Sequence, residues 1–329
     1  MRIFASLLVA LLAMVVFEPP TFAATASRRA AVSPRFVSVD AWAKQRGFTV
    51  RSHPAQRTVE LSKGTTRLVF SVDPRKDRSP MKFNGVNVLL AFPVHVQKGK
   101  AYVSQLDISE TLNPLLSPAK EPAGVRVRKI CLDAGHGGKD PGFRVGSRYE
   151  KQYTLLLARE VRTYLIQAGF EVIMTRNSDV FLDLGPRAEI ARQRRADVFV
   201  SLHFNAFPAS PAVKGVEVYC LTPSGAYSSN SGAKGDTRWL AGNRNNDQNI
   251  LLAYNVHGSM VRRLSVTDRG VKRARFKVLQ NATMPSVLVE GGFLSNPSEG
   301  KRIADPAYRK QMARAIADGI IAYRKSVER

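Results

Sequence analysis

Cysteine, histidine and acidic side chains are scarce in this chain of 329 residues. Its two cysteines, Cys131 and Cys220, allow no more than one disulfide bond. Both lie in apolar stretches typical of buried strands, where a free thiol behaves as a small hydrophobic group. The sequence therefore favours two free thiols, although an oxidising compartment would permit the pair to form.

Long hydrophobic runs are missing beyond the N-terminus, so we expect no membrane-spanning helix in the mature chain. The one such run, residues 3–17, follows Arg2 and is shorter than the roughly 20 residues that a span needs. Small residues follow it, which predicts a signal peptide at residues 1–26. An uncleaved anchor is the alternative. Either one exports the rest of the chain, to the periplasm or cell envelope.

Negative charge is outnumbered, because 26 Asp and Glu stand against 50 Lys and Arg, for a formal net charge of +24. A chain this basic often binds nucleic acid, but export argues against that partner. A polyanionic envelope component, such as cell-wall glycopeptide, anionic lipid or lipopolysaccharide, fits the compartment better. The alternative is that the charge serves solubility alone, since net charge informs association rather than fold.

The length suits two domains, and two patterns follow each other along the chain. Residues 35–115 alternate short strands with turns, which predicts a small α+β domain without a metal or acid–base cluster. A Pro-rich, polar linker is expected at 116–126. In 127–329 strands alternate with helices, and several strands are unbroken apolar runs, as in strands covered on both faces. This predicts an α/β fold, a three-layer αβα domain with a mostly parallel six-stranded sheet. Its expected strands are 127–132, 171–175, 197–203, 215–221, 276–279 and 286–290.

The stretch 131–142, with the sequence CLDAGHGGKDPG, contains the first candidate site residue. An apolar strand runs into a glycine-rich turn with His136 at its tip. Glycines on both sides of the imidazole permit unusual backbone angles and close approach of another group. We expect Gly137 and Gly138 to give clearance to a bulky substrate.

Three further polar groups follow strands in the same way. His203 ends the strand DVFVSLH, Glu290 ends SVLVE, and Glu150 lies in the loop after His136. Sheets of this kind bind ligands outside the carboxyl ends of their strands, so the four groups should converge. Two histidines and one carboxylate with an open fourth position predict a catalytic zinc site, beside which a second carboxylate moves a proton. Spacing alone leaves open which glutamate has which role.

Other polar residues have a structural interpretation that is at least as good. Glu217 is either catalytic or part of a salt bridge within its strand. Asn205 either orients the loop after His203 and the substrate, or simply forms a turn. We expect Arg187 to pair within the fold, with a substrate carboxylate as the alternative. His257, in the middle of a helix, is expected to face solvent.

A long polar loop follows the strand 215–221. It spans residues 222–247 and is rich in Ser, Gly and Asn. Long loops beside a site are usually functional or disordered. We therefore predict a mobile flap on the substrate side, with Trp239 packed on its rim.

Residues 128–325 resemble the zinc-dependent N-acetylmuramoyl-L-alanine amidases of the amidase-3 family of cell-wall hydrolases. The motifs that carry the resemblance are, in order, DAGHGGKDPG, YEK, MTRNSDVFLDLGPRAEIA, ADVFVSLHFNA, KGVEVYCL, DRGVKRARFKVLQNATMPSVLVEGGFLSNPSE and DPAYRKQMARAIADGI. The resemblance implies that His136, Glu150 and His203 bind Zn²⁺ and that Glu290 is the general acid/base. It also implies hydrolysis of the amide between N-acetylmuramic acid and L-alanine in peptidoglycan.

The N-terminal region is similar to the small domain named after the N-terminal region of copper amine oxidases. The similar stretches are GFTVRSHPAQRTVELSKGTTRLVFSV, NGVNVLLAFPVHVQKGKAYV and VSQLDISETLNPLL. This implies a wall-binding or interaction module, with a structural spacer as the alternative. We expect a monomer whose partner is peptidoglycan, and an activator protein is a further candidate partner. A zinc peptidase acting within the stem peptide and a non-catalytic wall-binding scaffold are the alternative functions.

Overall fold

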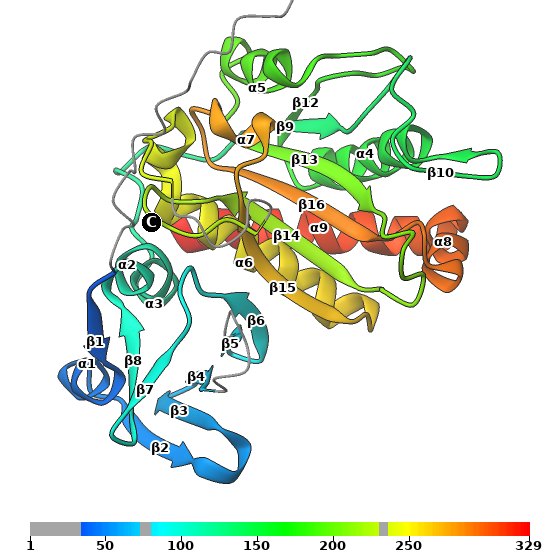
Figure 1. Cartoon of the computed structure of the whole chain (residues 1–329). Helices are drawn as coiled ribbons and strands as arrows, with labels where there is room; N and C mark the ends of the chain where they lie inside the picture. Colours follow the sequence, from blue (N-terminus) through cyan, green and yellow to red (C-terminus); the bar gives the residue numbers. More distant parts are fainter. Residues whose placement is uncertain (1–33, 73–79, 230–235) are drawn as a thin grey trace, which may run out of the picture. The chain divides into compact units, whose positions relative to one another are not determined.

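The computed structural model describes residues 34–72, 80–229 and 236–329 (Figure 1). The signal peptide predicted for 1–26 lies outside the described residues. In the part of the chain that is described, no helix is both long and apolar enough to cross a membrane.

Two groups of elements follow each other along the chain. The first group is β1 (Phe36–Ser38), α1 (Val39–Gln45), β2 (Thr49–His53), η1 (Pro54–Gln56), β3 (Thr58–Lys63), β4 (Thr66–Ser71), β5 (Pro80–Phe83), β6 (Val86–Leu89), β7 (His95–Gln97), β8 (Lys100–Ser104), α2 (Gln105–Asp107), η2 (Ile108–Leu112) and α3 (Asn113–Leu116). The second group is β9 (Lys129–Ala134), β10 (Arg144–Val145), β11 (Arg148–Tyr149), α4 (Glu150–Gln167), β12 (Glu171–Met174), α5 (Leu184–Gln193), β13 (Val198–Asn205), β14 (Val216–Leu221), η3 (Ala241–Asn245), α6 (Asn246–Leu264), β15 (Asp268–Ala274), α7 (Lys277–Gln280), β16 (Ser286–Phe293), α8 (Pro297–Ala304) and α9 (Pro306–Val327).

The second group builds a mixed sheet of six strands. Strands β12, β9, β13 and β16 lie side by side in that order and run parallel. Strand β14 follows β16 and runs antiparallel to it, while β15 runs parallel to β14. The ends of β9 and β13 therefore lie at the same edge of the sheet as the starts of β14 and β15. We call this edge the carboxyl edge.

Helices cover both faces of this sheet, which gives three layers. Helices α4, α6 and α9 pack on one face, and α5 and α7 belong to the other (Figure 1). Successive side chains of one strand point to opposite faces of the sheet. On β9, Ile130 and Leu132 join the apolar cluster on one face, and Cys131 joins the cluster on the other. Among the described residues Cys131 and Cys220 are free thiols, each buried in a different cluster. The expected αβα architecture is therefore present.

The sheet does not stop at β15. Strand β6 pairs with β15 in parallel, with Val88 opposite Val271, and the antiparallel strands β5, β4, β3 and β2 follow. The result is a sheet of eleven strands, and a separate three-stranded sheet contains β1, β8 and β7. The described residues form one compact unit. The division into domains at 35–115 and 127–329, with a linker at 116–126, stays a prediction.

One expected strand is wrong. Residues 276–279 overlap the short helix α7, and the sixth strand of the second group is β15 instead. Strand β15 has the sequence DRGVKRA, which is mostly charged and contains a glycine, so it looks like a loop. It is a strand because Val271 and Ala274 are buried between β14 and β6, and because its Arg273 donates to Thr111 Oγ1 at 3.0 Å.

Candidate metal centre

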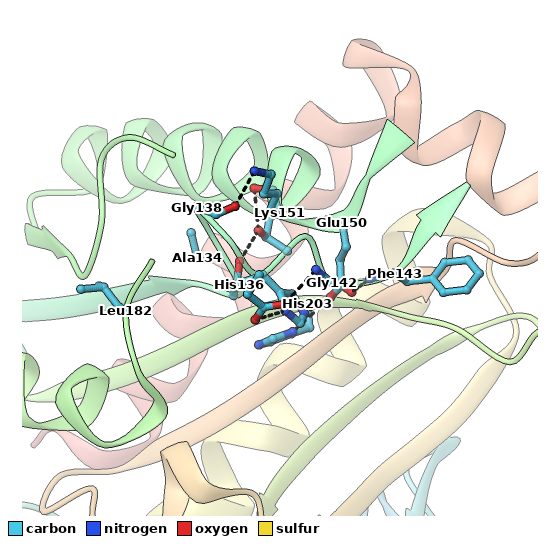
Figure 2. A network of polar contacts seen from close by, with 12 residues as sticks. Ala134, His136, Gly138, Gly142, Phe143, Glu150, Lys151, Leu182 and His203 are labelled. Atoms are coloured by element: carbon cyan, nitrogen blue, oxygen red, sulfur yellow. Dashed lines mark hydrogen bonds and ion pairs between the residues drawn. The ribbon is translucent and has the colours of Figure 1, made fainter. Parts of the chain in front are cut away.

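Three candidate ligands meet at the carboxyl edge (Figure 2). His136 follows β9, Glu150 is the first residue of α4, and His203 lies near the end of β13. One ligand atom from each lies within 4.8 Å of the others. Glu150 Oε1 is 3.0 Å from His136 Nε2 and 3.1 Å from His203 Nδ1. The sequence-predicted ligand set is thus brought together in space.

The local fold aims Glu150 at the two imidazoles. The β10–β11 hairpin precedes Glu150. The backbone N–H of Glu150 donates to the Phe143 carbonyl at 2.9 Å. An acidic residue is favoured at the start of a helix by the helix dipole. The Glu150 carboxylate also accepts the N–H groups of Phe143 at 3.0 Å and Phe204 at 3.2 Å. These bonds fix the carboxylate between the loop and β13.

The electrostatics of the three residues favour positive charge between them. Burial opposes ionisation of Glu150, but hydrogen bonds from His136 and His203 outweigh it and hold its pKa far below the usual value. Burial likewise opposes a charged His136, yet Glu150 and Asp140 outweigh it and raise the pKa of that imidazole. Two imidazole nitrogens and an anionic oxygen match the donors of a catalytic zinc site, so the residues present fit Zn²⁺.

Asp140 supports His136 from behind, and sequence reasoning missed it. Its Oδ2 lies 2.8 Å from His136 Nδ1, and its Oδ1 accepts the Gly142 N–H at 3.0 Å. Because a carboxylate accepts hydrogen bonds, Asp140 holds a proton on Nδ1, and a metal could replace the second ring proton on Nε2, which faces Glu150. Histidines that bind metals commonly have such a carboxylate partner.

Two glycines, which lack a Cβ, leave space for the side chains of the candidate ligands. A Cβ on Gly135 would lie 2.2 Å from His203 Cε1, and one on Gly142 would lie 2.7 Å from Glu150 Oε2. His136 itself has a φ of +61°, a left-handed conformation that non-glycine residues adopt at a cost. The glycine-rich motif therefore packs the ligands against the backbone.

Two buried arginines hold the loop that contains His136. Arg187 on α5 donates to Asp133 Oδ1 at 2.9 Å and to the carbonyl oxygens of Ala134 and His136 at 3.0 Å. Arg176 donates to the Ala134 carbonyl at 2.8 Å and to that of Gly135 at 2.9 Å. Arg187 thus pairs within the fold, as expected, while Arg176 had not been singled out as a residue of the site.

Glu290 lies beside the ligands on β16. In the sheet register it is opposite His203 on β13 and opposite Glu217 on β14. Burial, and next the charges of Glu150 and Glu217, raise its pKa well above the usual value. Its buried Oε2 has no hydrogen-bond partner among the described residues. The arrangement leaves a carboxyl group free to exchange a proton next to the candidate metal.

Glu217 and Asn205 have local partners. The Glu217 carboxylate is buried, contacts Arg269 and the Tyr219 hydroxyl, and lies 2.8 Å from Lys272 Nζ. This supports the salt-bridge interpretation of Glu217. Asn205 Oδ1 accepts the N–H of Ala206 at 2.8 Å, which supports a turn-forming role.

The expectation that His257 faces solvent is wrong. Its side chain is completely buried, and its Nε2 lies 2.6 Å from Asp268 Oδ1. The helix α6 is covered by both the sheet and α9, so a position in its middle has no solvent face here.

The expectation about Gly137 and Gly138 is also wrong. A Cβ on Gly137 would lie 2.2 Å from the Val180 carbonyl oxygen, and one on Gly138 would lie 2.6 Å from the backbone N of Phe181. The two glycines therefore give clearance to the chain segment after β12, which packs against them, and the space they leave is filled by protein.

The described part of the loop 222–247, which leaves out residues 230–235, does not lie at the carboxyl edge. It follows β14, and because β14 runs antiparallel to β16, its start lies opposite the other end of β16, near Ser286. The Ser286 N–H donates to Asn249 Oδ1 at 2.7 Å, just beyond this loop. In its described part Trp239 is 63% exposed. The antiparallel direction of β14 therefore contradicts the prediction of a flap at the site, because the loop begins at the opposite edge of the sheet.

Comparisons with known sequences point to one family. Residues 130–322 match the family model described as N-acetylmuramoyl-L-alanine amidase. The amidase AmiC of Neisseria meningitidis serogroup B is 42% identical over 218 residues, which are 59% of this chain and 52% of that protein. The amidase AmiA of Escherichia coli K12 is 32% identical over 249 residues, which are 67% of this chain and 84% of that protein. The chain thus spans about half the length of the Neisseria relative.

Solved structures show the same likeness. The amidase AmiC2 of Nostoc punctiforme is 34% identical, has a TM-score of 0.51, and the match covers 61% of this chain and 98% of that one. The CwlD amidase of Clostridioides difficile, solved in complex with the GerS lipoprotein, is 29% identical with a TM-score of 0.50. That match covers 60% of this chain and 98% of that one.

Proposed function

The chain belongs to the N-acetylmuramoyl-L-alanine amidase family, and we propose that His136, Glu150 and His203 hold a catalytic Zn²⁺ in its peptidoglycan amidase domain. The reaction is hydrolysis of the amide bond between N-acetylmuramic acid and the L-alanine of the stem peptide. The observation that carries the proposal is the meeting of these three ligands within 4.8 Å. Glu290 lies beside them, and its buried Oε2 has no hydrogen-bond partner among the described residues.

Asp140 and Glu290 have different roles in this hydrolysis. When bound, a zinc ion supplies Lewis acidity, which polarises a carbonyl and lowers the pKa of water to roughly 7. Asp140 holds a proton of His136 on Nδ1, which would leave Nε2 available to a metal. In its carboxylate form, which a bound cation would favour, Glu290 takes a proton from the attacking water as the new C–O bond forms. It then gives this proton to the alanine nitrogen as the C–N bond breaks, which releases a free amine.

Product analysis tests the function. Purified peptidoglycan digested with the protein should release peptides whose N-terminal L-alanine is free, as read by mass spectrometry. The protein should contain zinc, and a chelator should abolish activity until zinc is restored. His136→Ala should lose both zinc and hydrolysis. Glu290→Gln should keep zinc and lose activity by roughly 10²- to 10⁴-fold, the usual contribution of a general acid/base.

A histidine remote from the site serves as the control. His95→Ala, on the exposed strand β7, should keep zinc and activity. Cleavage within the stem peptide would instead show a zinc peptidase. Wall binding without any cleavage would show a scaffold, and either result would overturn the proposal.

The remaining proposals concern location and partners. We propose that the chain is exported to the periplasm or cell envelope, where peptidoglycan lies, and that residues 35–115 bind the wall. Its net charge of +24 supports association with a glycopeptide that has free carboxylates. An activator protein is a candidate partner, supported by the structural relative that was solved with a lipoprotein.

A further inference from the structure

Two basic side chains lie at the carboxyl edge, beyond Glu290. Arg269 and Lys272 belong to β15, and both contact the carboxylate of Glu217 on the neighbouring strand. Glu217 is 1% exposed, so its negative charge is balanced by these two side chains and not by solvent. Two cations against one carboxylate leave a positive charge next to the candidate metal centre.

The guanidinium group of Arg269 is hydrogen-bonded through Nε, while its two terminal nitrogens have no hydrogen-bond partner among the described residues. Its Nε donates to Glu217 Oε1, and the group lies over the Phe293 ring, 5.1 Å from the centroid. Its Nη1 and Nη2 form no hydrogen bond with the described residues, and the side chain is 33% exposed. A guanidinium held in this way presents a fixed fork of N–H groups, which matches a carboxylate in geometry and charge.

The sheet register gives the distance from His203 to Glu217, the residue whose carboxylate anchors this fork. Glu217 lies opposite Glu290, which lies opposite His203, so two strand spacings separate Glu217 from His203. At about 4.8 Å per spacing this is about 10 Å. An extended peptide covers about 3.3–3.6 Å per residue, so about three residues span the gap.

We propose that Arg269 binds a carboxylate of the stem peptide about three residues from the scissile amide, with Lys272 adding a second positive charge. The inference rests on the proposed amidase function and adds to it a subsite for the acidic part of the substrate. The peptide is favoured over the glycan as the ligand, because the amide-linked N-acetyl sugars offer no free carboxylate.

Two matched substrates test the subsite. Muramyl tripeptide with free carboxylates is compared with the same molecule in which the carboxylates are carboxamides, using the full-length protein. Wild type should favour the free carboxylates. Arg269→Gln should lower kcat/KM for that substrate roughly ten- to hundred-fold, the usual range for a charge-assisted bidentate pair. The loss should appear mainly in KM, because the contact is remote from the reacting atoms.

Two further variants complete the design. Arg269→Lys keeps a cation beside Glu217 but lacks the fork, so it should retain zinc and kcat while KM still rises. Arg324→Gln is the matched control, because Arg324 is another partly buried arginine over an aromatic ring, that of Phe170 on the far side of the domain. It should change neither KM nor kcat.

The outcomes separate the two proposals. If wild type frees no N-terminal L-alanine from either substrate, the amidase proposal fails. If wild type cuts both substrates equally well, the subsite alone is wrong. If Arg269→Gln loses kcat equally on both substrates, Arg269 serves to hold Glu217 and the subsite is again overturned.

Discussion

Gly135 shows that the candidate metal centre requires a residue without a side chain next to His136. This residue lies between β9 and His136, and its N–H donates to the Leu202 carbonyl at 3.1 Å, which ties the loop to β13. The imidazole of His203 occupies the space where a Cβ would be. The φ of Gly135 is not in the left-handed region, so its requirement for glycine comes from space and not from backbone conformation.

We expect Gly135→Ala to disable the centre. The new Cβ would lie 2.2 Å from His203 Cε1 and 2.4 Å from Nε2, so the imidazole must leave its position. Zinc content should fall below one ion per chain and amidase activity should be lost. Gly185→Ala, on α5 where a Cβ meets nothing within 4 Å, should retain both. Full zinc occupancy in Gly135→Ala would contradict this account.

The sequence points to the candidate site residues because their pattern is local. His136 follows β9, His203 and Glu290 lie near the ends of the apolar strands β13 and β16, and the carboxyl ends of parallel strands converge. Asp140 and Arg176 could not be found in this way. They are charged residues in loops, and among 50 basic and 26 acidic residues nothing in the sequence separates a support of the site from a surface charge. Their role depends on which backbone group or imidazole they meet in space.

At the scale of elements, α5 is attached to the site through one side chain. Arg187 is 2% exposed and joins this helix to the end of β9 through Asp133, which is completely buried. Asp133 also accepts the hydroxyls of Thr175 at 2.6 Å and Ser201 at 2.7 Å. The buried pair therefore connects β9, β13, the residue that follows β12 and the helix α5 close to His136.

Removing this pair should destabilise the domain strongly. Arg187→Gln leaves the buried charge of Asp133 without its partner, which typically costs about 3–5 kcal/mol of the free energy of unfolding. Urea unfolding followed by circular dichroism would measure the loss. Arg192→Gln, on the same helix with an exposed partner in Glu189, should leave the unfolding curve unchanged. A small effect of Arg187→Gln would contradict a stabilising role for this buried pair.

Elements were predictable where pattern and burial agree. The apolar runs of β9, β13 and β16 and the long helices α4, α6 and α9 were recognisable, since each has the periodicity of its burial. Strand β15 was not, because the contacts of Val271 with β14 and β6 are long-range and leave no local pattern. The direction of β14 was equally hidden. An apolar strand looks the same in either direction, yet its direction decided at which edge of the sheet the loop 222–247 begins.

At the scale of the whole molecule, one carboxylate connects the two groups of strands. Asp268 Oδ2 accepts the N–H of Asn87 on β6 at 2.9 Å, while its Oδ1 accepts from Gly270 at 2.9 Å and faces His257 Nε2 at 2.6 Å. The continuation of the sheet into β6 was not predicted, because the sequence shows apolar strands on both sides of residues 116–126 but not which edges meet. Asp268 is the residue through which that junction can be tested.

The ionised form of Asp268 should stabilise the fold at neutral pH. Burial opposes its charge, but the hydrogen bond and the charge of His257 outweigh burial and lower its pKa. A carboxylate whose folded-state pKa is lowered contributes stability above its unfolded pKa of about 3.9, and this contribution is lost as the pH falls through the lower, folded-state value. Asp268→Asn should therefore lose about 1–3 kcal/mol of unfolding free energy at pH 7, the usual cost of leaving a buried partner unsatisfied. The difference from wild type should shrink progressively below about pH 4. Urea titrations of both proteins between pH 7 and pH 3 measure it, and a difference that stays constant across this range would mean that Asp268 acts through packing and not through its charge.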